Sequence, residues 1–444
     1  MRTPICDFVR DYAEREGARF HMPGHKGRGN LGFEKYDITE ICGADVLYSP
    51  EGVILESENI ASELFGTAHS FYSTEGSTLC IKAMLRLVTA GESSEQPLIL
   101  AARNVHRAFV SAAALLDLEV GWIYPEEFTS LCSASVTPEA VERAISESPR
   151  KPSAVYITSP DYLGGIADVR GIAEVCHRAG VPLAVDNAHG AYLRFLSPSR
   201  HPVDLGADIT CDSAHKTLPV LTGGAYLHIS KNADGKYLER ARGALSLFAS
   251  TSPSYLILQS LDECNRYLGE SFKEELCETV ARVKRLKADI LGMGIPLLES
   301  EPLKVVFDCR GMGWRGDDFS EFLRAREIEI EFSDRDLAVL MIAPKNSESE
   351  LSLLLSALSE IEKKEPLEVE LPTLPRAERR VSVREAVLAE SERIRIENAV
   401  GRVCADVCVS CPPAVPIAVS GEVITEETVN LLRYYGAEEI SVVK

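Results

Sequence analysis

The fold of this chain is decided by two stretches, Val185-Asp186-Asn187-Ala188-His189-Gly190 and Asp212-Ser213-Ala214-His215-Lys216-Thr217. The apolar run 182–185 leads into the first stretch, and the run 207–211 leads into the second. A buried parallel strand delivers the residue at its carboxyl end to the open edge of a sheet. The two strand ends therefore place the Asp186 carboxylate and the Lys216 amine at one edge. A lysine beside a histidine and a serine, with an aspartate as partner, suits an enzyme that holds an aldehyde cofactor as a Schiff base.

A second motif, earlier in the chain, suits an anion. Residues 70–73 predict a strand, Thr74-Glu75-Gly76 predicts a turn, and Ser77-Thr78 begins a helix. Free backbone N–H groups at a helix N-terminus, together with the helix dipole, favour a phosphate at this position. Alternatively, Ser77 serves only as the N-cap of the helix. The two roles are compatible.

Length and composition limit the class of protein. With 444 residues, two or three domains are expected. The hydrophobic content of 45% and the charged content of 26% are typical of a soluble globular protein. The net charge of −20 argues against nucleic acid as a partner. An acidic surface helps to attract a cationic substrate, although most acidic enzymes use it only for solubility.

The N-terminus lacks the apolar core of a signal peptide, and no apolar run reaches the ~18 residues of a membrane span. We therefore expect a cytoplasmic protein without a membrane partner. The 12 cysteines are expected to be reduced and mostly buried. The closest set is Cys404, Cys408 and Cys411, which has no histidine nearby and no second ligand pair, so no metal site is expected.

Strand and helix patterns alternate between residues 66 and 230, which predicts an α/β fold with a mainly parallel sheet. A long helix is expected from Tyr255 to about Val283, followed by a small α+β part in which Ile328 to Phe332 alternates like a strand. The expected domains are an N-terminal segment (1–40), a cofactor-binding large domain (41–250), a connecting helix with a small α+β domain (251–365) and a C-terminal domain (366–444).

Several segments, in this order, resemble the pyridoxal-phosphate-dependent ornithine/lysine/arginine decarboxylases of bacteria, in their short form without the wing domain. Glu75 stands where that family usually has Asn or Gln, and Gly223 where it tends to have Gln. Cys411 and Ala414 replace the family's Tyr and Gly. Besides the Asp186 and Lys216 motifs, the resembling segments are His21-Met22-Pro23-Gly24-His25-Lys26-Gly27, Phe71-Tyr72-Ser73-Thr74-Glu75-Gly76-Ser77-Thr78, Arg103-Asn104-Val105-His106-Arg107, Thr251-Ser252-Pro253-Ser254-Tyr255 and Cys411-Pro412-Pro413-Ala414-Val415-Pro416.

The resemblance implies a large domain of fold type I, pyridoxal phosphate as cofactor and a role for each site residue. Lys216 would bind the cofactor, Asp186 would lie under its pyridine nitrogen, and His106 would stack on its ring. His189 and His215 either orient groups on the cofactor or substrate, or serve only as hydrogen-bond partners behind the site. The residues expected to hold the phosphate are Gly76, Ser77, Thr78 and Ser213.

The function implied by the resemblance is decarboxylation of arginine, lysine or ornithine to agmatine, cadaverine or putrescine. Glu422 is a tentative contact for the distal cation of the substrate; alternatively, it is a surface acid near a turn. Residues 249–255 match a segment that often reaches the neighbouring subunit, so we expect a homodimer with shared sites or a higher homo-oligomer. Two other functions stay open, namely an aminotransferase or β-eliminating lyase on the same scaffold, and a catalytically silent homologue.

Overall fold

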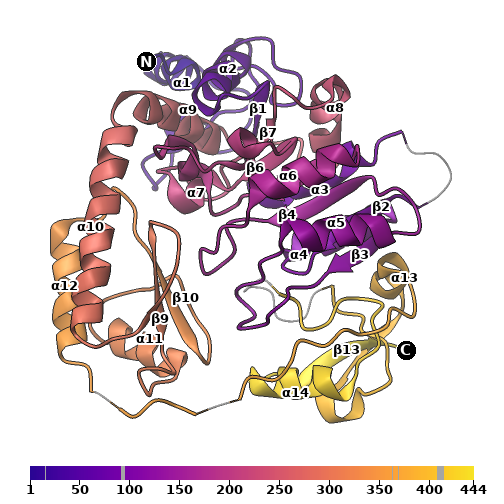
Figure 1. Ribbon diagram of the computed structural model, residues 1–444. Helices are drawn as coiled ribbons and strands as arrows, with labels where there is room; N and C mark the ends of the chain where they lie inside the picture. The colour runs from indigo at the N-terminus through magenta and orange to yellow at the C-terminus, as the bar shows by residue number, and fades with distance from the viewer. Residues whose placement is uncertain (16, 92–95, 363, 369, 408–414) are drawn as a thin grey trace. The chain divides into compact units, whose positions relative to one another are not determined.

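A computed structural model describes residues 1–444 except 16, 92–95, 363, 369 and 408–414. The chain divides into two compact units (Figure 1). Among the described helices, none is long and apolar enough to cross a membrane. The first unit consists of Met1–Ile123, Val136–Ser159 and Asp168–Lys273, and the second unit of Tyr124–Ser135, Pro160–Ala167 and Glu274–Lys444.

A seven-stranded sheet forms the centre of the first unit. In their order across the sheet, the strands are β1 (His69–Ser73), β7 (Ala225–Ile229), β6 (Ile209–Asp212), β5 (Leu183–Asp186), β4 (Ala154–Thr158), β2 (Leu98–Ala102) and β3 (Glu119–Ile123). The pairs from β6 to β3 are parallel, whereas β7 runs antiparallel to both β6 and β1. The predicted mainly parallel α/β sheet is confirmed.

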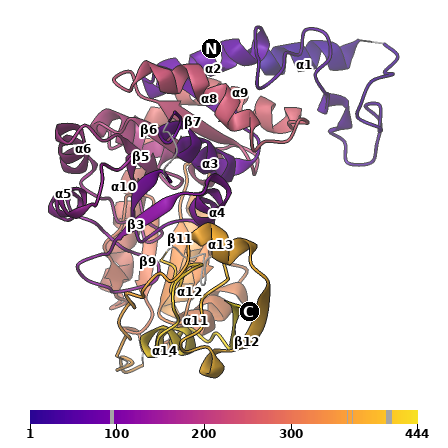
Figure 2. The same cartoon turned by 90° about the vertical axis from the view of Figure 1, so that its right-hand side faces the viewer.

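Helices cover both faces of this sheet, because its strands are apolar on both sides. The helices of the first unit are α1 (Pro4–Glu14), α2 (Val53–Phe65), α3 (Gly76–Val88), α4 (Arg107–Leu116), α5 (Pro138–Glu147), α6 (Val169–Arg178), α7 (Ala214–Thr217), α8 (Gly235–Ser246) and α9 (Tyr255–Glu270), with short 3-10 turns η1 (Glu34–Tyr36), η2 (Ala191–Phe195) and η3 (Pro202–Leu205). Figure 2 shows α3 and α4 on one side of the strands and α5 and α6 on the other.

Local sequence accounts for where these helices begin and end. The side chain of Asp168 accepts a hydrogen bond from the Gly171 backbone N–H (3.0 Å) and so caps the beginning of α6. Ile172, which lies on the apolar face of that helix, is fully buried. At the other end of a helix, Gly66 adopts a left-handed conformation (φ 72°) and terminates α2.

The prediction of one long helix from Tyr255 to about Val283 is wrong. Two helices, α9 and α10 (Phe272–Gly292), occupy this stretch. Ser271 separates them, because its backbone (φ −128°) leaves the helical region. The next residue, Phe272, is fully buried, with its ring 5.3 Å from that of Phe195. Packing of this ring therefore competes with continuation of the helix.

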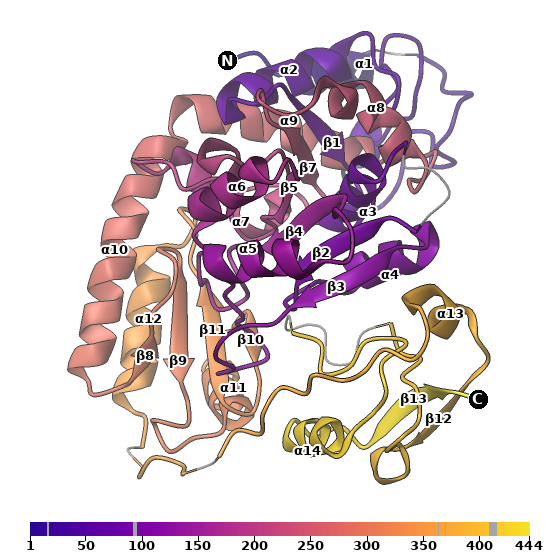
Figure 3. The same cartoon turned by 45° about the vertical axis from the view of Figure 1, so that its right-hand side comes forward.

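The second unit contains a four-stranded antiparallel sheet in the order β10-β11-β9-β8. Its elements are β8 (Leu297–Leu298), β9 (Lys304–Asp308), α11 (Gly316–Arg324), β10 (Phe332–Ser333), β11 (Leu337–Met341) and α12 (Glu348–Ser359). Helices α10 and α12 lie side by side (Figure 3), joined by an ion pair between Arg282 and Glu348 (3.3 Å).

The predicted strand from Ile328 to Phe332 is largely wrong, because only Phe332–Ser333 pairs with β11. Ile328 and Ile330 still pack against the core, which explains their alternation. The backbone N–H of Glu331 donates to the carbonyl of Val339 (3.0 Å), but the ladder is not continued before it. Residues 328–331 therefore alternate between core-facing and exposed side chains without forming a paired ladder with a neighbouring strand, and this alternation resembles a strand in the sequence.

The C-terminal part of the second unit packs around a core that includes Ile424, Leu431 and Val442, together with Leu131 from the segment 124–135. Strands β12 and β13 pair antiparallel. The domain boundaries expected from the sequence remain a prediction. The elements of this part are α13 (Val383–Leu388), β12 (Ser391–Arg395), η4 (Ile396–Asn398), α14 (Glu426–Tyr434) and β13 (Glu439–Val443).

Candidate active site

The carboxyl ends of β5 and β6 bring the two deciding motifs together. Lys216 lies in α7, which follows β6 directly, and His189 lies in the turn after β5. The Lys216 Nζ atom is 3.0 Å from the His189 Nε2 atom. His189 is buried, and Lys216 is half-buried. The amine that the sequence placed at this edge is therefore held against an imidazole from the neighbouring strand end.

Asp186, the last residue of β5, is buried and surrounded by hydrogen-bond donors. Its Oδ1 atom accepts from the Ala188 backbone N–H (3.1 Å) and from the Cys211 thiol (3.6 Å), and its Oδ2 atom accepts from the Tyr156 hydroxyl (3.3 Å). Burial, and then the charge of Asp186, raise the pKa of both Tyr156 and Cys211 well above the usual range. Both groups therefore stay protonated and donate to the carboxylate.

Tyr156 was not predicted from the sequence as part of this site. Its position in β4, beside β5, is what brings its hydroxyl to Asp186. A buried tyrosine hydroxyl usually has a hydrogen-bond partner. A tyrosine in the apolar strand 154–158 was therefore a usable signal for a polar group at the adjacent strand end.

The turn before α3 has the features of an anion site. Gly76 has a left-handed backbone (φ 68°), and a Cβ placed there would meet no atom of the described residues within 4 Å. The N-cap residue Glu75 makes no side-chain capping bond within the described part of the chain. Ser77 and Ser213 are buried, and the Ser213 hydroxyl donates to that of Ser77 (2.8 Å). Thr78, by contrast, is exposed.

The Glu75 side chain points away from the open space beside Gly76. A carboxylate pointing into that space would repel a phosphate. Its Oε1 atom accepts a hydrogen bond from the Ser250 backbone N–H (2.7 Å). The acid at this position therefore fastens the segment after α8 and does not point at the open space beside Gly76.

Gly223 holds the same turn from the opposite side. Its carbonyl accepts the Gly76 backbone N–H (2.7 Å). Its φ is +101°, and a Cβ would come within 2.9 Å of the Thr74 carbonyl oxygen. Glycine is thus required for this backbone conformation and this close approach.

His106 is the N-cap residue of α4, at the end of the loop after β2. Its Nδ1 atom accepts the Ala108 backbone N–H (3.1 Å), which leaves Nε2 as the protonated nitrogen of a neutral ring. Burial lowers the pKa of His106, while Asp186 raises it and Lys216 lowers it further. Burial outweighs the charge of Asp186, so His106 is a neutral imidazole.

His215 has a partner within the fold. Its Nδ1 atom donates to the carbonyl of Gly224 (3.0 Å), which links α7 to the turn before β7. This contact helps to orient α7, and the role of His215 toward the cofactor or substrate stays a prediction.

Glu422 belongs to the second unit and is not a surface acid. Its side chain is buried, and its Oε2 atom accepts the Val419 backbone N–H (2.9 Å). The alternative of an exposed acid near a turn is therefore wrong, and its role toward a substrate stays a prediction. Cys411 and Ala414 lie outside the described residues.

The residues of the first unit fit pyridoxal phosphate. The space beside Gly76, at a helix N-terminus and next to two buried serine hydroxyls, suits a phosphate dianion. Lys216 supplies the amine for an aldehyde, and Asp186 supplies a buried carboxylate for a ring nitrogen. Asp186 and Lys216 come from the ends of the neighbouring strands β5 and β6, and the Gly76 turn follows β1, which β7 separates from β6. Ligands bind at such strand ends in open α/β sheets.

Comparison with known proteins agrees with this fit. Residues 3–306 match the Orn/Lys/Arg decarboxylase major domain, and residues 370–441 match the C-terminal domain of the same family. The arginine decarboxylase of Halalkalibacterium halodurans is 30% identical over 467 residues, covering 97% of this chain and 93% of that protein. The arginine decarboxylase of Bacillus subtilis is 30% identical over 463 residues, with the same coverage of 97% and 93%.

Solved structures show the same fold. The lysine decarboxylase of Francisella novicida superposes with a TM-score of 0.84 at 16% identity, over 100% of this chain and 81% of that one. The constitutive lysine decarboxylase of E. coli gives a TM-score of 0.79 at 18% identity, over 100% and 82% of the two chains. The fold, the strand-end chemistry and the matched length together identify the chain as a member of the Orn/Lys/Arg decarboxylase family.

Proposed function

We propose that this protein is a pyridoxal-phosphate-dependent decarboxylase of a basic amino acid, with arginine as the substrate to test first. The observation that carries the proposal is the Lys216 amine, 3.0 Å from His189, in the unit that also holds the buried Asp186 carboxylate and the start of α3, where the N-cap side chain makes no capping bond within the described residues. Arginine comes first because the two relatives described above, which match 97% of the chain, are arginine decarboxylases.

The bound cofactor would supply an electron sink for the bond pair that remains when the substrate carboxylate leaves as CO₂. Asp186, with its three donors in place, would hold a proton on the ring nitrogen. The neutral His106 would lie against the ring, and His189 would hold or move a proton at the Lys216 amine, which it contacts. We further assign Gly76, Ser77, Thr78 and Ser213 to the phosphate, and Glu422 to the distal cation of the substrate.

A homo-oligomer, at least a dimer, is part of the proposal. Figure 2 shows the loop after α1 projecting from the rest of the first unit. This loop exposes large apolar side chains, with Phe20 93% exposed and Leu31 72% exposed. Exposed apolar side chains gathered in one segment are typical of a surface that a second chain covers. A cytoplasmic location remains part of the same proposal.

The test is a decarboxylation panel on purified protein with added pyridoxal phosphate. Release of CO₂ and of agmatine from arginine is expected, with lysine and ornithine measured in parallel. Lys216→Ala should abolish turnover, and Asp186→Asn should lower kcat by about 100-fold or more. Lys231→Ala, at an exposed position, is the matched control and should keep full activity.

The same panel separates the other functions. Keto acid or pyruvate as product would favour an aminotransferase or lyase. Cofactor binding without turnover on any basic amino acid would favour a silent homologue. Activity of Asp186→Asn close to wild type would contradict the role given to this carboxylate.

A further inference from the structure

A fully buried cluster of His201, Asp212 and His228 lies behind the site. The Asp212 Oδ2 atom is 2.9 Å from His201 Nε2 and 3.2 Å from His228 Nε2. All three side chains have no exposed surface. None of the three side chains takes part in the hydrogen bonds given above for Asp186, His189 and Lys216. The cluster therefore needs an explanation of its own.

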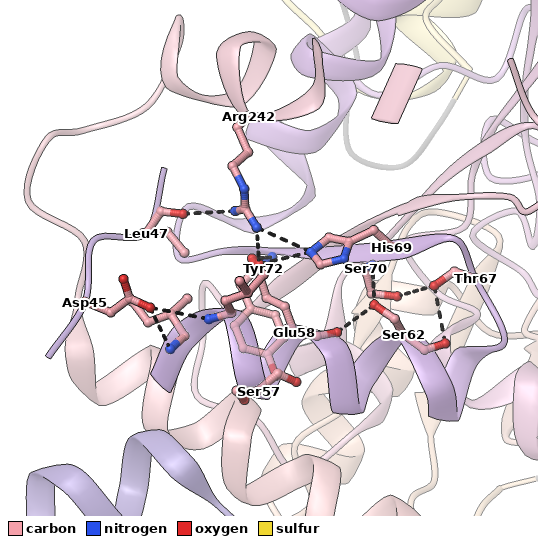
Figure 4. Close-up of polar contacts among 12 residues, drawn as sticks. Asp45, Leu47, Ser57, Glu58, Ser62, Thr67, His69, Ser70, Tyr72 and Arg242 are labelled. Atoms are coloured by element: carbon pink, nitrogen blue, oxygen red, sulfur yellow. Dashed lines mark hydrogen bonds and ion pairs between the residues drawn. The ribbon is translucent and has the colours of Figure 1, made fainter. Parts of the chain in front are cut away.

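The protons of this cluster can be assigned from its outer contacts. The His201 Nδ1 atom accepts the Val203 backbone N–H (3.3 Å), so the proton of the neutral ring lies on Nε2 and is donated to Asp212. The His228 Nδ1 atom is 2.8 Å from the Ser70 hydroxyl, which also contacts the Thr67 hydroxyl (2.8 Å). The Ser70 backbone N–H donates to the Ser62 hydroxyl (2.8 Å; Figure 4). Burial lowers the pKa of His228, so this ring is also a neutral donor.

Asp212 is therefore a carboxylate that accepts hydrogen bonds. Burial alone would raise its pKa, but the contacts with His201 and His228 outweigh burial and lower it. The histidine nitrogens that face Asp212 carry protons in this arrangement, so they have no lone pair for a metal. The cluster is complete as a set of hydrogen bonds.

The other carboxylate oxygen of Asp212 contacts Asn187, which follows β5 directly. Asp212 Oδ1 accepts from the Asn187 side-chain Nδ2 atom at 2.7 Å. Asn187 is the residue between Asp186 and the turn that carries His189. Its backbone N–H also donates to the Cys211 carbonyl (2.9 Å), and its carbonyl accepts the Gly190 backbone N–H (2.8 Å). Asn187 thus links the end of β5 to the end of β6 through both its backbone and its side chain.

We propose that Asp212 is a positioning residue. Its hydrogen bond with Asn187 fixes the end of β5 and the following turn, which carry Asp186 and His189, relative to the segment that carries Ser213 and Lys216. The inference rests on the proposed use of pyridoxal phosphate. In this proposal the buried cluster keeps the segment after β5 and the segment after β6 in a fixed position relative to each other. A 2.7 Å bond between an amide and a carboxylate is directional, and that is the property a positioning contact needs.

The amide of Asn187 and the carboxylate of Asp212 can be exchanged between the two positions, and this exchange tests the proposal. In Asn187→Asp, two buried carboxylates face each other, and the dissociation constant of pyridoxal phosphate should rise by about tenfold or more. In the double variant Asn187→Asp/Asp212→Asn, the amide at position 212 still accepts from both histidines and donates to the new carboxylate. This variant should return the dissociation constant to within about threefold of wild type, since the bond is remade in the opposite sense.

Three readouts are needed. Fluorescence quenching gives the cofactor dissociation constant, the visible absorbance band reports the environment of the bound cofactor, and thermal unfolding followed by circular dichroism shows that every variant is folded at the assay temperature. Thr210→Val is the matched control, because Thr210 is buried in β6 and its hydroxyl has no partner in the described part of the chain. Its affinity and absorbance band should equal those of wild type.

The proposal is overturned if folded Asn187→Asp binds the cofactor with wild-type affinity and an unchanged band, or if the reversed pair fails to recover either. A stoichiometric metal in the purified protein, lost in Asp212→Asn, would also overturn it and assign the cluster to a metal. Failure of the proposed decarboxylation is a separate outcome, because it is read from products and not from cofactor affinity.

Discussion

The Glu58–Arg242 pair offers a sharp test of how the first unit holds the strand before the Gly76 turn in place. Glu58, on α2, has a fully buried side chain, and its Oε2 atom is 2.6 Å from the Arg242 guanidinium on α8 (Figure 4). The same carboxylate accepts from the Tyr72 backbone N–H at 2.9 Å. Arg242 also donates to the carbonyl of Leu47 (3.2 Å). One buried carboxylate thus joins α2, α8 and the strand that leads into the turn at Gly76.

Arg242→Met removes the cation and keeps much of the apolar stem. Removal of one partner of a buried ion pair costs about 3–5 kcal/mol, because the remaining charge is left without compensation. In Arg242→Met the Glu58 carboxylate keeps the Tyr72 backbone N–H and the His69 ring, whose Nε2 atom lies 3.1 Å from Oε2. Since the Arg242 side chain is also 24% exposed, water screens the pair in part, and we expect the lower end, about 3 kcal/mol. The free energy of unfolding is measured by urea denaturation followed by circular dichroism.

The control is the double variant Arg242→Met/Glu58→Gln. Glutamine is neutral and can still accept from Tyr72, so the double variant should be more stable than Arg242→Met by about 1–2 kcal/mol. The reasoning is refuted if Arg242→Met loses less than about 1 kcal/mol, or if the second substitution adds to the loss.

Two further predictions concern a buried acid and the phosphate cradle. Burial raises the pKa of Asp262 to about 6, so its protonated form favours the fold; the stability it adds is complete below the unfolded pKa and is lost as the pH rises through about 6. Between about pH 7.5 and about pH 4, wild type should gain roughly 2–3 kcal/mol over Asp262→Asn in urea denaturation, and parallel pH profiles would contradict this. Ser213→Ala removes the hydroxyl that contacts Ser77, and the dissociation constant of pyridoxal phosphate should rise about five- to tenfold, corresponding to one hydrogen bond; an unchanged constant would remove Ser213 from the phosphate site.

Much of the fold followed from the sequence because local patterns and tertiary packing agree there. The apolar run before Asp186 forms a strand that is buried along its whole length, and the acid lies at its carboxyl end. The turn at Gly76 could be predicted because a left-handed residue before a helix favours glycine. The placement of Asp186 and Lys216 at one edge of the sheet followed from the rule that parallel strands end there.

The rest depends on contacts between residues far apart in the chain. Tyr156 and Asp186 meet only because β4 pairs with β5 in one register. His228 reaches Asp212 because β7 runs antiparallel to β6, and neither residue belongs to a recognisable spacing. The break at Ser271 likewise reflects the burial of the Phe272 ring, which a helical pattern does not express.

Strand β1 has one neighbour in the sheet, β7, which lies far along the chain from it. On the ribosome, residues 69–73 are made first and find no sheet partner until residues 225–229 emerge. At the usual rate of synthesis, about 5–20 residues per second, that interval lasts roughly 8 to 30 s. The bond from Gly76 to Gly223 forms after a similar delay, so the turn at the start of α3 is not fixed from this side until residue 223 has been translated.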